Sequence, residues 1–137
     1  MDLNKIERAQ PISKDQIKAI IHLLPIFTTK GFQFGHWKFE KGYFPYFIFS
    51  SEAHAFYKAL YDNGWIIPFD WGSWHDEAVR YVNDETLLKE ADLETLRRLL
   101  TTHVRKDRFC GGHLDCMFEC GHVTAILQRL QQLETEA

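Results

Sequence analysis

All three cysteines of the chain lie in one short segment, between residues 110 and 122, together with two of its seven histidines. The segment reads Cys-Gly-Gly-His-Leu-Asp-Cys-Met-Phe-Glu-Cys-Gly-His. Thiolate and imidazole are the side-chain groups that bind zinc most readily. The segment therefore folds either around a metal ion or as an ordinary packed helix, and this choice constrains the rest of the fold.

Helical packing is the better interpretation. If residues 113–120 form one helix, His113 and Cys120 are separated along its axis by roughly 10 Å, too far to share one ion. The familiar zinc pattern of two cysteines separated by two residues and repeated later does not occur. At 100° per residue, Cys116 and Cys120 fall with Met117 in one broad arc, opposite Asp115. Because reduced cysteine behaves as a small hydrophobe, we expect these thiols to be buried.

A zinc-stabilised domain stays open as an alternative. Its ligands would come from the same segment, with a further donor such as His103, and the donors available there are Cys110, His113, Cys116, Cys120 and His122. We therefore expect no cofactor, with zinc as the alternative.

Length and composition indicate one soluble globular domain. The chain has 137 residues, of which 45% are hydrophobic and 26% charged. We expect an N-terminal arm over residues 1–12, a domain over 13–133 and a frayed tail over 134–137. The net charge of -3 and the pI near 6.1 give no field that attracts nucleic acid. No apolar run reaches the length of a membrane span, no signal peptide is recognisable, and the odd number of cysteines fits a reducing compartment, so we expect a cytoplasmic protein.

Apolar periodicity and capping residues predict a mainly helical fold. We expect helices after Ser13, after Ser50 or Ser51, from Trp74 with Ser73 as cap, in a short turn capped by Asn83, after Asp92, over 113–120 and over the apolar stripe from Val123 to Leu133. The helix after Asp92 has the clearest pattern, with leucines along one side. Residues 32–49 are rich in aromatics and broken by glycine and proline, which predicts a short β-hairpin or extended arms.

Basic and aromatic residues suggest a binding groove. Arg105 and Arg108 share one helix face if the leucine-rich helix persists, and two guanidinium groups can bind a carboxylate or phosphate. Trp71 and Trp74 lie in a segment that also holds three carboxylates and a histidine. Internal pairing of the arginines with acidic residues, and packing of the tryptophans in the core, are the alternatives.

Two catalytic alternatives stay open. Cys110 lies between Arg108 and a pair of glycines whose amides could bind an anion, as a nucleophile requires. A hydrolase or transferase could instead use the carboxylates and imidazole of Asp70, His75, Asp76 and Glu77.

Several short motifs of the chain resemble an uncharacterised family of small bacterial proteins known as a domain of unknown function. The motifs are Phe69-Asp-Trp71 with Trp74, then Thr102-x-x-Arg105-x-x-Arg108-Phe109-x-x-Gly112-x-Leu114, and then Gly121 with Ile126-Leu127-x-Arg129-Leu130. They cover about the C-terminal two thirds. The resemblance implies a bacterial, cytosolic, self-standing domain and carries over no activity or catalytic residue.

The sequence therefore predicts a noncatalytic binding or interaction module. Its groove would take an anionic small ligand or a protein segment, and its tentative residues are Asp70, Trp71, Trp74, Arg105, Arg108, Phe109 and Gly112. An exposed aromatic patch would also suit self-association.

Overall fold

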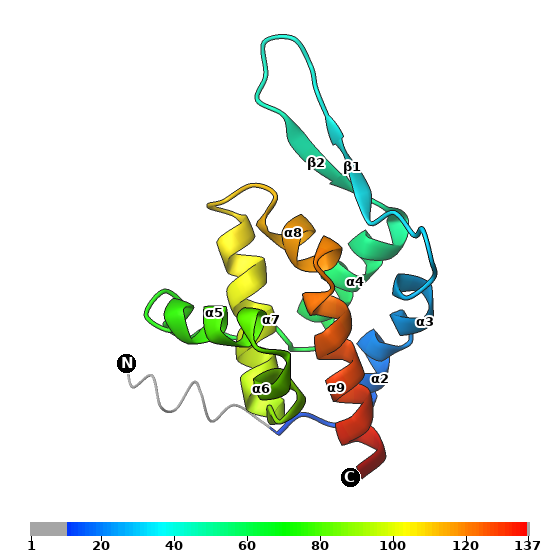
Figure 1. Cartoon of the computed structure of the whole chain (residues 1–137), viewed down its shortest axis with the longest axis vertical. Coiled ribbons are helices and arrows are strands. Elements are labelled where there is room, and N and C mark those ends of the chain that lie inside the picture. Colours follow the sequence, from blue (N-terminus) through cyan, green and yellow to red (C-terminus); the bar gives the residue numbers. More distant parts are fainter. Residues whose placement is uncertain (1–10, 137) are drawn as a thin grey trace.

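The computed structural model describes residues 11–136 and has a helical body from which one β-hairpin projects (Figure 1). This confirms the predicted fold class. In chain order the elements are α2 (Lys14–Ile21), α3 (Leu24–Phe27), β1 (Gly35–Lys38), β2 (Tyr46–Phe49), α4 (Ser51–Asp62), α5 (His75–Asn83), α6 (Glu85–Lys89), α7 (Leu93–Asp107), α8 (His113–Glu119) and α9 (His122–Glu136).

Three helices begin at the caps that the sequence predicts. The Ser13 hydroxyl accepts from the Gln16 backbone N–H at 3.2 Å, while the Gln16 side chain accepts from the Ser13 N–H at 2.8 Å. Ser50 caps α4 and Asp92 caps α7 through their side-chain oxygens. Each bond satisfies a backbone donor that the first helical turn leaves without a partner.

Two predicted caps are wrong. The Ser73 hydroxyl donates to the Asp70 carboxylate at 2.7 Å, so it belongs to the preceding turn, and α5 begins at His75 without a side-chain cap. Asp84, and not Asn83, caps α6 by accepting from the Leu87 N–H. At α5 the Asp70 carboxylate holds Ser73 in the preceding turn by accepting from both its N–H and its hydroxyl, whereas at α6 the Asp84 carboxylate lies one residue closer to the free amides and takes the capping role.

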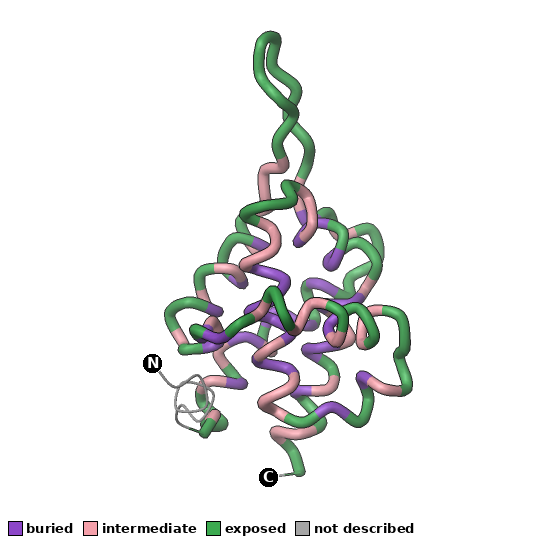
Figure 2. The backbone as a smooth tube through the Cα atoms, turned by 90° about the vertical axis from the view of Figure 1, so that its left-hand side faces the viewer, coloured by how far each residue is buried: buried purple, intermediate pink, exposed green. Residues whose placement is uncertain are grey.

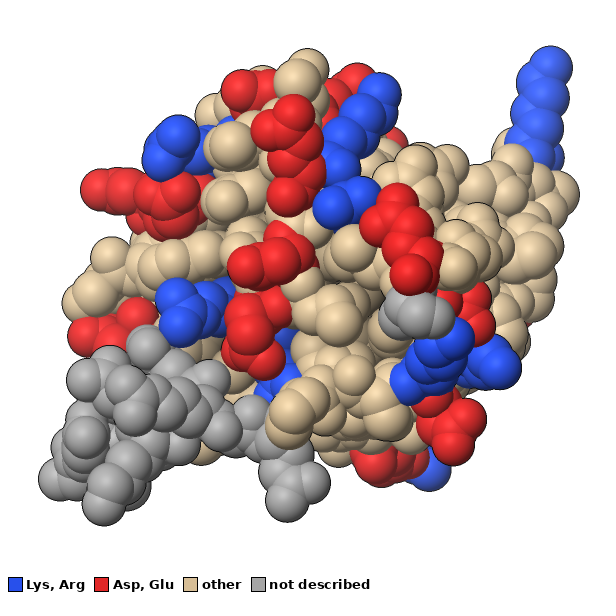
Figure 3. Space-filling view, turned by 90° about the horizontal axis from the view of Figure 1, so that it is seen from below, with Lys and Arg blue, Asp and Glu red and all other residues tan. Residues whose placement is uncertain are grey.

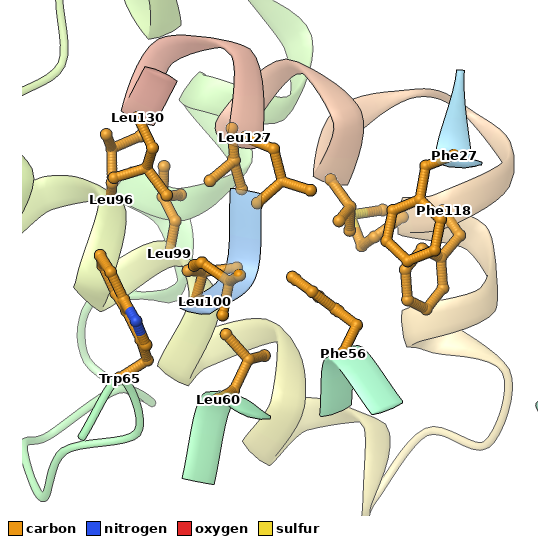
Figure 4. Packing of buried hydrophobic residues seen from close by; sticks show 14 of the residues in the cluster. Phe27, Phe56, Leu60, Trp65, Leu96, Leu99, Leu100, Phe118, Leu127 and Leu130 are labelled. Carbon is orange, nitrogen blue, oxygen red and sulfur yellow. The ribbon is translucent and has the colours of Figure 1, made fainter. Parts of the chain in front are cut away.

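The hydrophobic core forms around α9, which packs against α2, α3, α6, α7 and α8. Figure 4 shows leucines of α7 and α9 facing one another, with Phe56 and Leu60 of α4 and the indole of Trp65 closing the other side. Trp65 is fully buried, and its indole N–H donates to the Gln16 carbonyl at 3.0 Å. The leucine stripe of α7 is thus the inner side of the helix, as its periodicity predicts.

Phe118 of α8 joins the core to the hairpin. Its ring lies within 4.8–6.0 Å of four other aromatic rings, measured between centroids: Phe27, Phe34, Phe49 and Phe56. The contacts include one stacked pair and three edge-to-face pairs, the arrangements that aromatic quadrupoles favour.

The hairpin pairs β1 with β2 in antiparallel register, from Gly35 opposite Phe49 to Lys38 opposite Tyr46. Figure 2 shows its base partly buried and its outer half exposed on both sides. Gly35 has no room for a side chain, because a Cβ there would lie 2.2 Å from the Ile48 carbonyl oxygen. The two strands therefore approach each other so closely at the base of the hairpin that only glycine fits at residue 35.

The ends of the chain are only partly covered by the structure. Most of the predicted N-terminal arm, residues 1–10, lies outside the described residues, as does Ala137. Helix α9 continues through Glu136, so it includes most of the segment predicted as a tail. Between residues 11 and 136 no helix has both the length and the apolar character needed to cross a bilayer.

The aromatic cluster predicts a large difference between two phenylalanines. Phe118→Ala should lower the free energy of unfolding by about 3–5 kcal/mol, because it removes a fully buried ring and leaves a cavity. Phe109→Ala, at a site that is 78% exposed, should change it by about 0.5 kcal/mol or less. Urea unfolding followed by circular dichroism measures both, and equal effects would contradict the packing described here.

Candidate functional site

Three histidines from three helices form a hydrogen-bonded chain inside the body. The Nδ1 atom of His103, in α7, lies 3.0 Å from Nε2 of His113, in α8. On the other side of the same ring, its Nε2 atom lies 3.1 Å from Nε2 of His122, at the start of α9. His103 is 3% exposed and His122 is 5% exposed. We call these three residues the imidazole chain.

The imidazole chain permits two arrangements of its protons. A neutral His103 carries one N–H, so it donates to one neighbour and accepts from the other. Either His122 donates to His103 and His103 donates to His113, or both bonds point the opposite way. Each arrangement satisfies both hydrogen bonds without a net charge. The imidazole chain therefore has the hydrogen bonds needed to pass a proton in either direction between His113 and His122.

Burial holds the whole chain in its neutral form. It lowers the pKa of His113 and of His122 from 6.5 to about 4, and it places the pKa of His103 well below 6.5. The neighbouring imidazoles and the Lys106 ammonium add to this effect, because a second positive charge nearby disfavours protonation. Near neutral pH the three imidazoles are therefore uncharged.

One end of the chain opens into a cavity of about 260 Å³, which we call the imidazole cavity. Its polar lining comes from His103, His113, Lys106, His75 and Thr102. The remaining lining is apolar, from Ala78, Val79, Val82 and Met117. Lys106 donates from Nζ to His75 Nε2 at 2.7 Å, since an ammonium has no lone pair and can act only as the donor.

Among the residues that line this cavity in the described part of the chain, none is a carboxylate. An ammonium and three imidazoles therefore face a partly apolar space with no acidic side chain in its lining. His122, at the other end of the chain, lines a second cavity of about 230 Å³ that also contacts Val82. The imidazole chain thus runs from one cavity to another.

The residues predicted for the groove lie in separate surroundings. The structure brings Trp71 together with Phe109, whose ring centroids are 5.8 Å apart. Trp74 instead packs between Phe69 and Tyr81.

The other predicted groove residues each have a local partner or a different neighbour. Asp70 accepts a hydrogen bond from Ser73, and Gly112 lies against Trp37. The positive charge of Arg108 partly offsets the burial that raises the pKa of the Tyr57 hydroxyl. Arg105 is half-buried near the end of α7. A common groove that joins these residues stays a prediction.

One further arginine of α7, Arg97, is buried and paired inside the protein. The Arg97 side chain is 3% exposed and pairs with Glu94 at 3.2 Å. On the face seen from below in Figure 3, acidic and basic side chains alternate. The Arg97–Glu94 pair is an example of the internal pairing between arginines and acidic residues that the sequence left open as an alternative.

The prediction that the thiols of α8 are buried is wrong. Cys110, Cys116 and Cys120 are exposed free thiols, although helical packing was expected to bury the last two. The buried side of α8 is formed by Leu114, Met117 and Phe118, with Asp115 at its edge. The helix is rotated relative to the expected arc because Phe118 packs into the aromatic cluster, which carries the thiols to the opposite side.

The five donors of the zinc alternative do not converge. His113 and His122 point toward His103, while the thiols face solvent. Within residues 11–136 no group of three or more histidine, cysteine or acidic side chains is placed to hold a metal ion.

His103 was considered only as a distant zinc donor. Its position carried a stronger signal, since it lies seven residues after Leu96 and one before Val104, inside the apolar stripe of α7. A histidine at such a position is buried with the stripe and needs a hydrogen-bond partner there. The identity of that partner, however, depends on how α8 and α9 pack.

Exposed thiols predict rapid chemical modification. In the native protein, purified without added metal, all three cysteines should react with dithionitrobenzoate within about tenfold of their rates in the denatured chain. A chelator should leave these rates unchanged, and elemental analysis should find no stoichiometric zinc. Thiols that become reactive only after chelation would contradict the arrangement and restore the zinc alternative.

The imidazole chain predicts a loss of stability between pH 6.5 and pH 4. Because the folded pKa values are lowered, the unfolded chain takes up protons first as the pH falls below 6.5. Stability is therefore complete above pH 6.5 and declines as the pH falls toward 4. His122 alone would contribute on the order of 3 kcal/mol, and less where its protonation is coupled to that of its neighbours.

Urea unfolding at pH 7.5, 6 and 5 measures this decline. His122→Gln should reduce the pH dependence, whereas His54→Gln, at an exposed position of α4, should leave it as in the wild type. A wild-type stability that is the same at pH 7.5 and pH 5 would contradict the buried neutral chain.

Comparison with protein families gives one match, to the model described as a family of unknown function (DUF6508), over residues 12–136. No match was found among curated proteins or among solved structures.

Proposed function

The chain belongs to DUF6508, a family of unknown function, so no activity comes with the family, and we propose that this protein binds a small organic anion in the imidazole cavity. The observation that carries the proposal is the lining of that cavity. Lys106, Thr102 and three imidazoles face a space whose remaining lining is apolar, with no carboxylate among its described lining residues.

The geometry favours a carboxylate with a short apolar part. The cavity, at about 260 Å³, is smaller than the ~300–1,000 Å³ typical of sites for drug-sized ligands. Lys106 Nζ can donate a charge-assisted hydrogen bond to an anionic oxygen while it keeps His75 as a second partner. Val79, Val82 and Met117 would contact the apolar part.

Anion binding would also be linked to protonation of the imidazole chain. An anion beside His113 raises the pKa of that imidazole from about 4 toward its ordinary value, because it stabilises the charged form. Binding then takes up a proton, and affinity increases as the pH falls from 7 toward 5. His103 and His122 provide a path by which that proton is shared with the second cavity.

We place this function in the cytoplasm. Cys110, Cys116 and Cys120 are exposed and unpaired, a state that a reducing compartment maintains.

The test uses butyrate as the probe and butyramide as its uncharged analogue. Titration followed by ¹H–¹³C NMR should show butyrate shifting the methyl signals of Val79, Val82 and Met117, with a dissociation constant on the order of 1 mM or below. Lys106→Met should weaken binding by about tenfold or more, since it removes a charge-assisted hydrogen bond. Butyramide should produce no saturable shifts.

Lys58→Met is the matched control, because Lys58 is an exposed lysine of α4 that pairs with Asp62. It should bind butyrate as the wild type does. Butyrate shifts that are equal in the Lys106→Met variant, or an affinity that falls as the pH is lowered from 7 to 5.5, would overturn the proposal.

A second candidate function is proton-transfer catalysis on the bound acid, and the imidazole chain is the observation that favours it. Chains of neutral imidazoles with two tautomeric arrangements can accept a proton at one end and release it at the other. His103→Gln interrupts the chain but leaves Lys106 and His75 in place. Unchanged ¹⁵N tautomer signals of His113 and His122 in that variant would exclude a connected relay.

A further inference from the structure

The outer half of the hairpin exposes an unusual amount of aromatic surface. Phe44 is 94% exposed, Phe39 76% and Tyr43 73%, while Trp37 and Tyr46 are about two-fifths exposed. We call residues 35–49 the arm, which is distinct from the predicted N-terminal arm of residues 1–12. Large exposed apolar surfaces of this kind mark interaction sites on soluble proteins.

The base of the arm carries a cavity of about 240 Å³. One wall comes from the arm, through Trp37, Pro45, Tyr46, Phe47 and Phe49. The other comes from the end of α7, the loop after it and the start of α8, through Asp107, Gly111, Gly112 and Asp115. We call it the arm cavity. An apolar cavity of ~150 Å³ already admits a benzene ring, so the arm cavity has room for a phenyl side chain.

The arm cavity also contains an incompletely satisfied carboxylate. Asp115 is 9% exposed, and its Oδ1 atom has no hydrogen-bond partner in the described part of the chain. Burial and the nearby Glu119 raise the pKa of this carboxyl, and the neighbouring Trp37 indole only partly offsets them. A buried carboxylate oxygen without a partner is costly, so a donor supplied from outside would stabilise it.

We propose that the arm is a dimerisation element that exchanges its tip with a second copy of this chain, Phe44 of each copy occupying the arm cavity of the other. Two arms laid side by side in opposite directions place the tip of each at the base of the other. At about 3.4 Å per residue the strand Gly35–Lys38 spans roughly 10 Å, and the loop that follows extends the arm further from the body (Figure 1). The contact is made twice by one two-fold axis and closes on itself.

Charge complementarity supports a second copy as the occupant. Lys41 lies beside Gly42 at the exposed tip, and the tip would meet the base that holds Asp107 and Asp115. Its ammonium can donate to the Asp115 oxygen that lacks a partner. The same chain therefore carries both an exposed cation at the tip and a buried acceptor at the base.

The available area is that of a stable interface. At about 200 Å² for each fully exposed aromatic side chain, the exposed parts of the five arm aromatics come to roughly 650 Å² on one copy. Two copies would bury roughly 1,300 Å², within the ~1,200–2,000 Å² of specific protein interfaces.

Sedimentation velocity of the full chain over a concentration series tests the proposal. The wild type should be a dimer with a dissociation constant in the micromolar range or below. Phe44→Ser should raise that constant by about 100-fold or more, because it removes both inserted rings. The variant should keep the wild-type circular dichroism spectrum, since Phe44 makes no contribution to the core of one copy.

Tyr61→Ser is the matched control, as Tyr61 is an exposed aromatic residue on α4, away from the arm. It should dimerise as the wild type does. A wild type that stays monomeric at about 100 µM, well above a micromolar constant, would overturn the proposal. A dimer that Phe44→Ser leaves intact would overturn it too, because another surface would then hold the copies together.

Cross-linking tests the side-by-side arrangement. In a Tyr43→Cys variant that keeps Phe44 and also carries Cys116→Ser and Cys120→Ser, the new thiol should form a disulfide with Cys110 of the second copy, which adjoins the arm cavity at Gly111. An equal mixture of ¹⁴N and ¹⁵N protein should give cross-linked peptides of mixed isotope composition. Peptides of a single isotope composition only, or no disulfide under oxidation, would contradict the exchange of tips.

Discussion

The burial of Phe118 is the interaction on which the arrangement of the C-terminal third depends. Its ring contacts four aromatic rings from three other parts of the chain, and those contacts set the rotation of α8 about its own axis. Because successive side chains on a helix are 100° apart, one anchored ring determines where every other residue of the helix points. The exposed thiols, the buried Asp115 and the direction of His113 all follow from this one rotation.

The imidazole chain and the arm cavity both use residues of the first turn of α8. His113, the first residue of α8, reaches His103 and closes one side of the imidazole cavity. Asp115, two residues later, lies under Trp37 and faces the arm cavity. Gly112 precedes both and has no side chain because a Cβ there would lie 2.8 Å from the Trp37 ring. A small displacement of α8 would therefore affect both places.

This arrangement gives a physical connection between the two proposals without merging them. Binding of an anion at Lys106 and His113 changes the charge at the first residue of α8, and seating of a second copy changes the surroundings of Asp115 in the same turn. Each site has its own cavity and its own polar groups. Both groups lie in the first turn of α8, whose position rests on the contacts of Phe118, and one of these contacts, with Phe49, reaches the wall of the arm cavity.

Much of the fold could be predicted from local patterns. Ser13, Ser50 and Asp92 cap helices as expected, and the leucine stripe of α7 faces the core, because capping and periodicity depend on residues within one or two turns. The aromatic hairpin was recognisable from its composition and its glycines. The predicted family resemblance agrees with the DUF6508 match as far as an uncharacterised domain.

The caps at Ser73 and Asn83 were predicted wrongly for a local reason, competition from the carboxylates of Asp70 and Asp84.

The imidazole chain and its cavity could not be predicted, because their geometry is not local. The sequence by itself determined that α7 is amphipathic and that the segment from residue 113 is helical, since both depend on spacing along the chain. Only the tertiary structure decided which side of α8 is buried, because Cys116 and Phe118 are both hydrophobic enough for the interior, and the aromatic rings of three distant segments favour the phenylalanine. That choice placed three histidines from three helices within hydrogen-bonding distance and turned the thiols toward solvent.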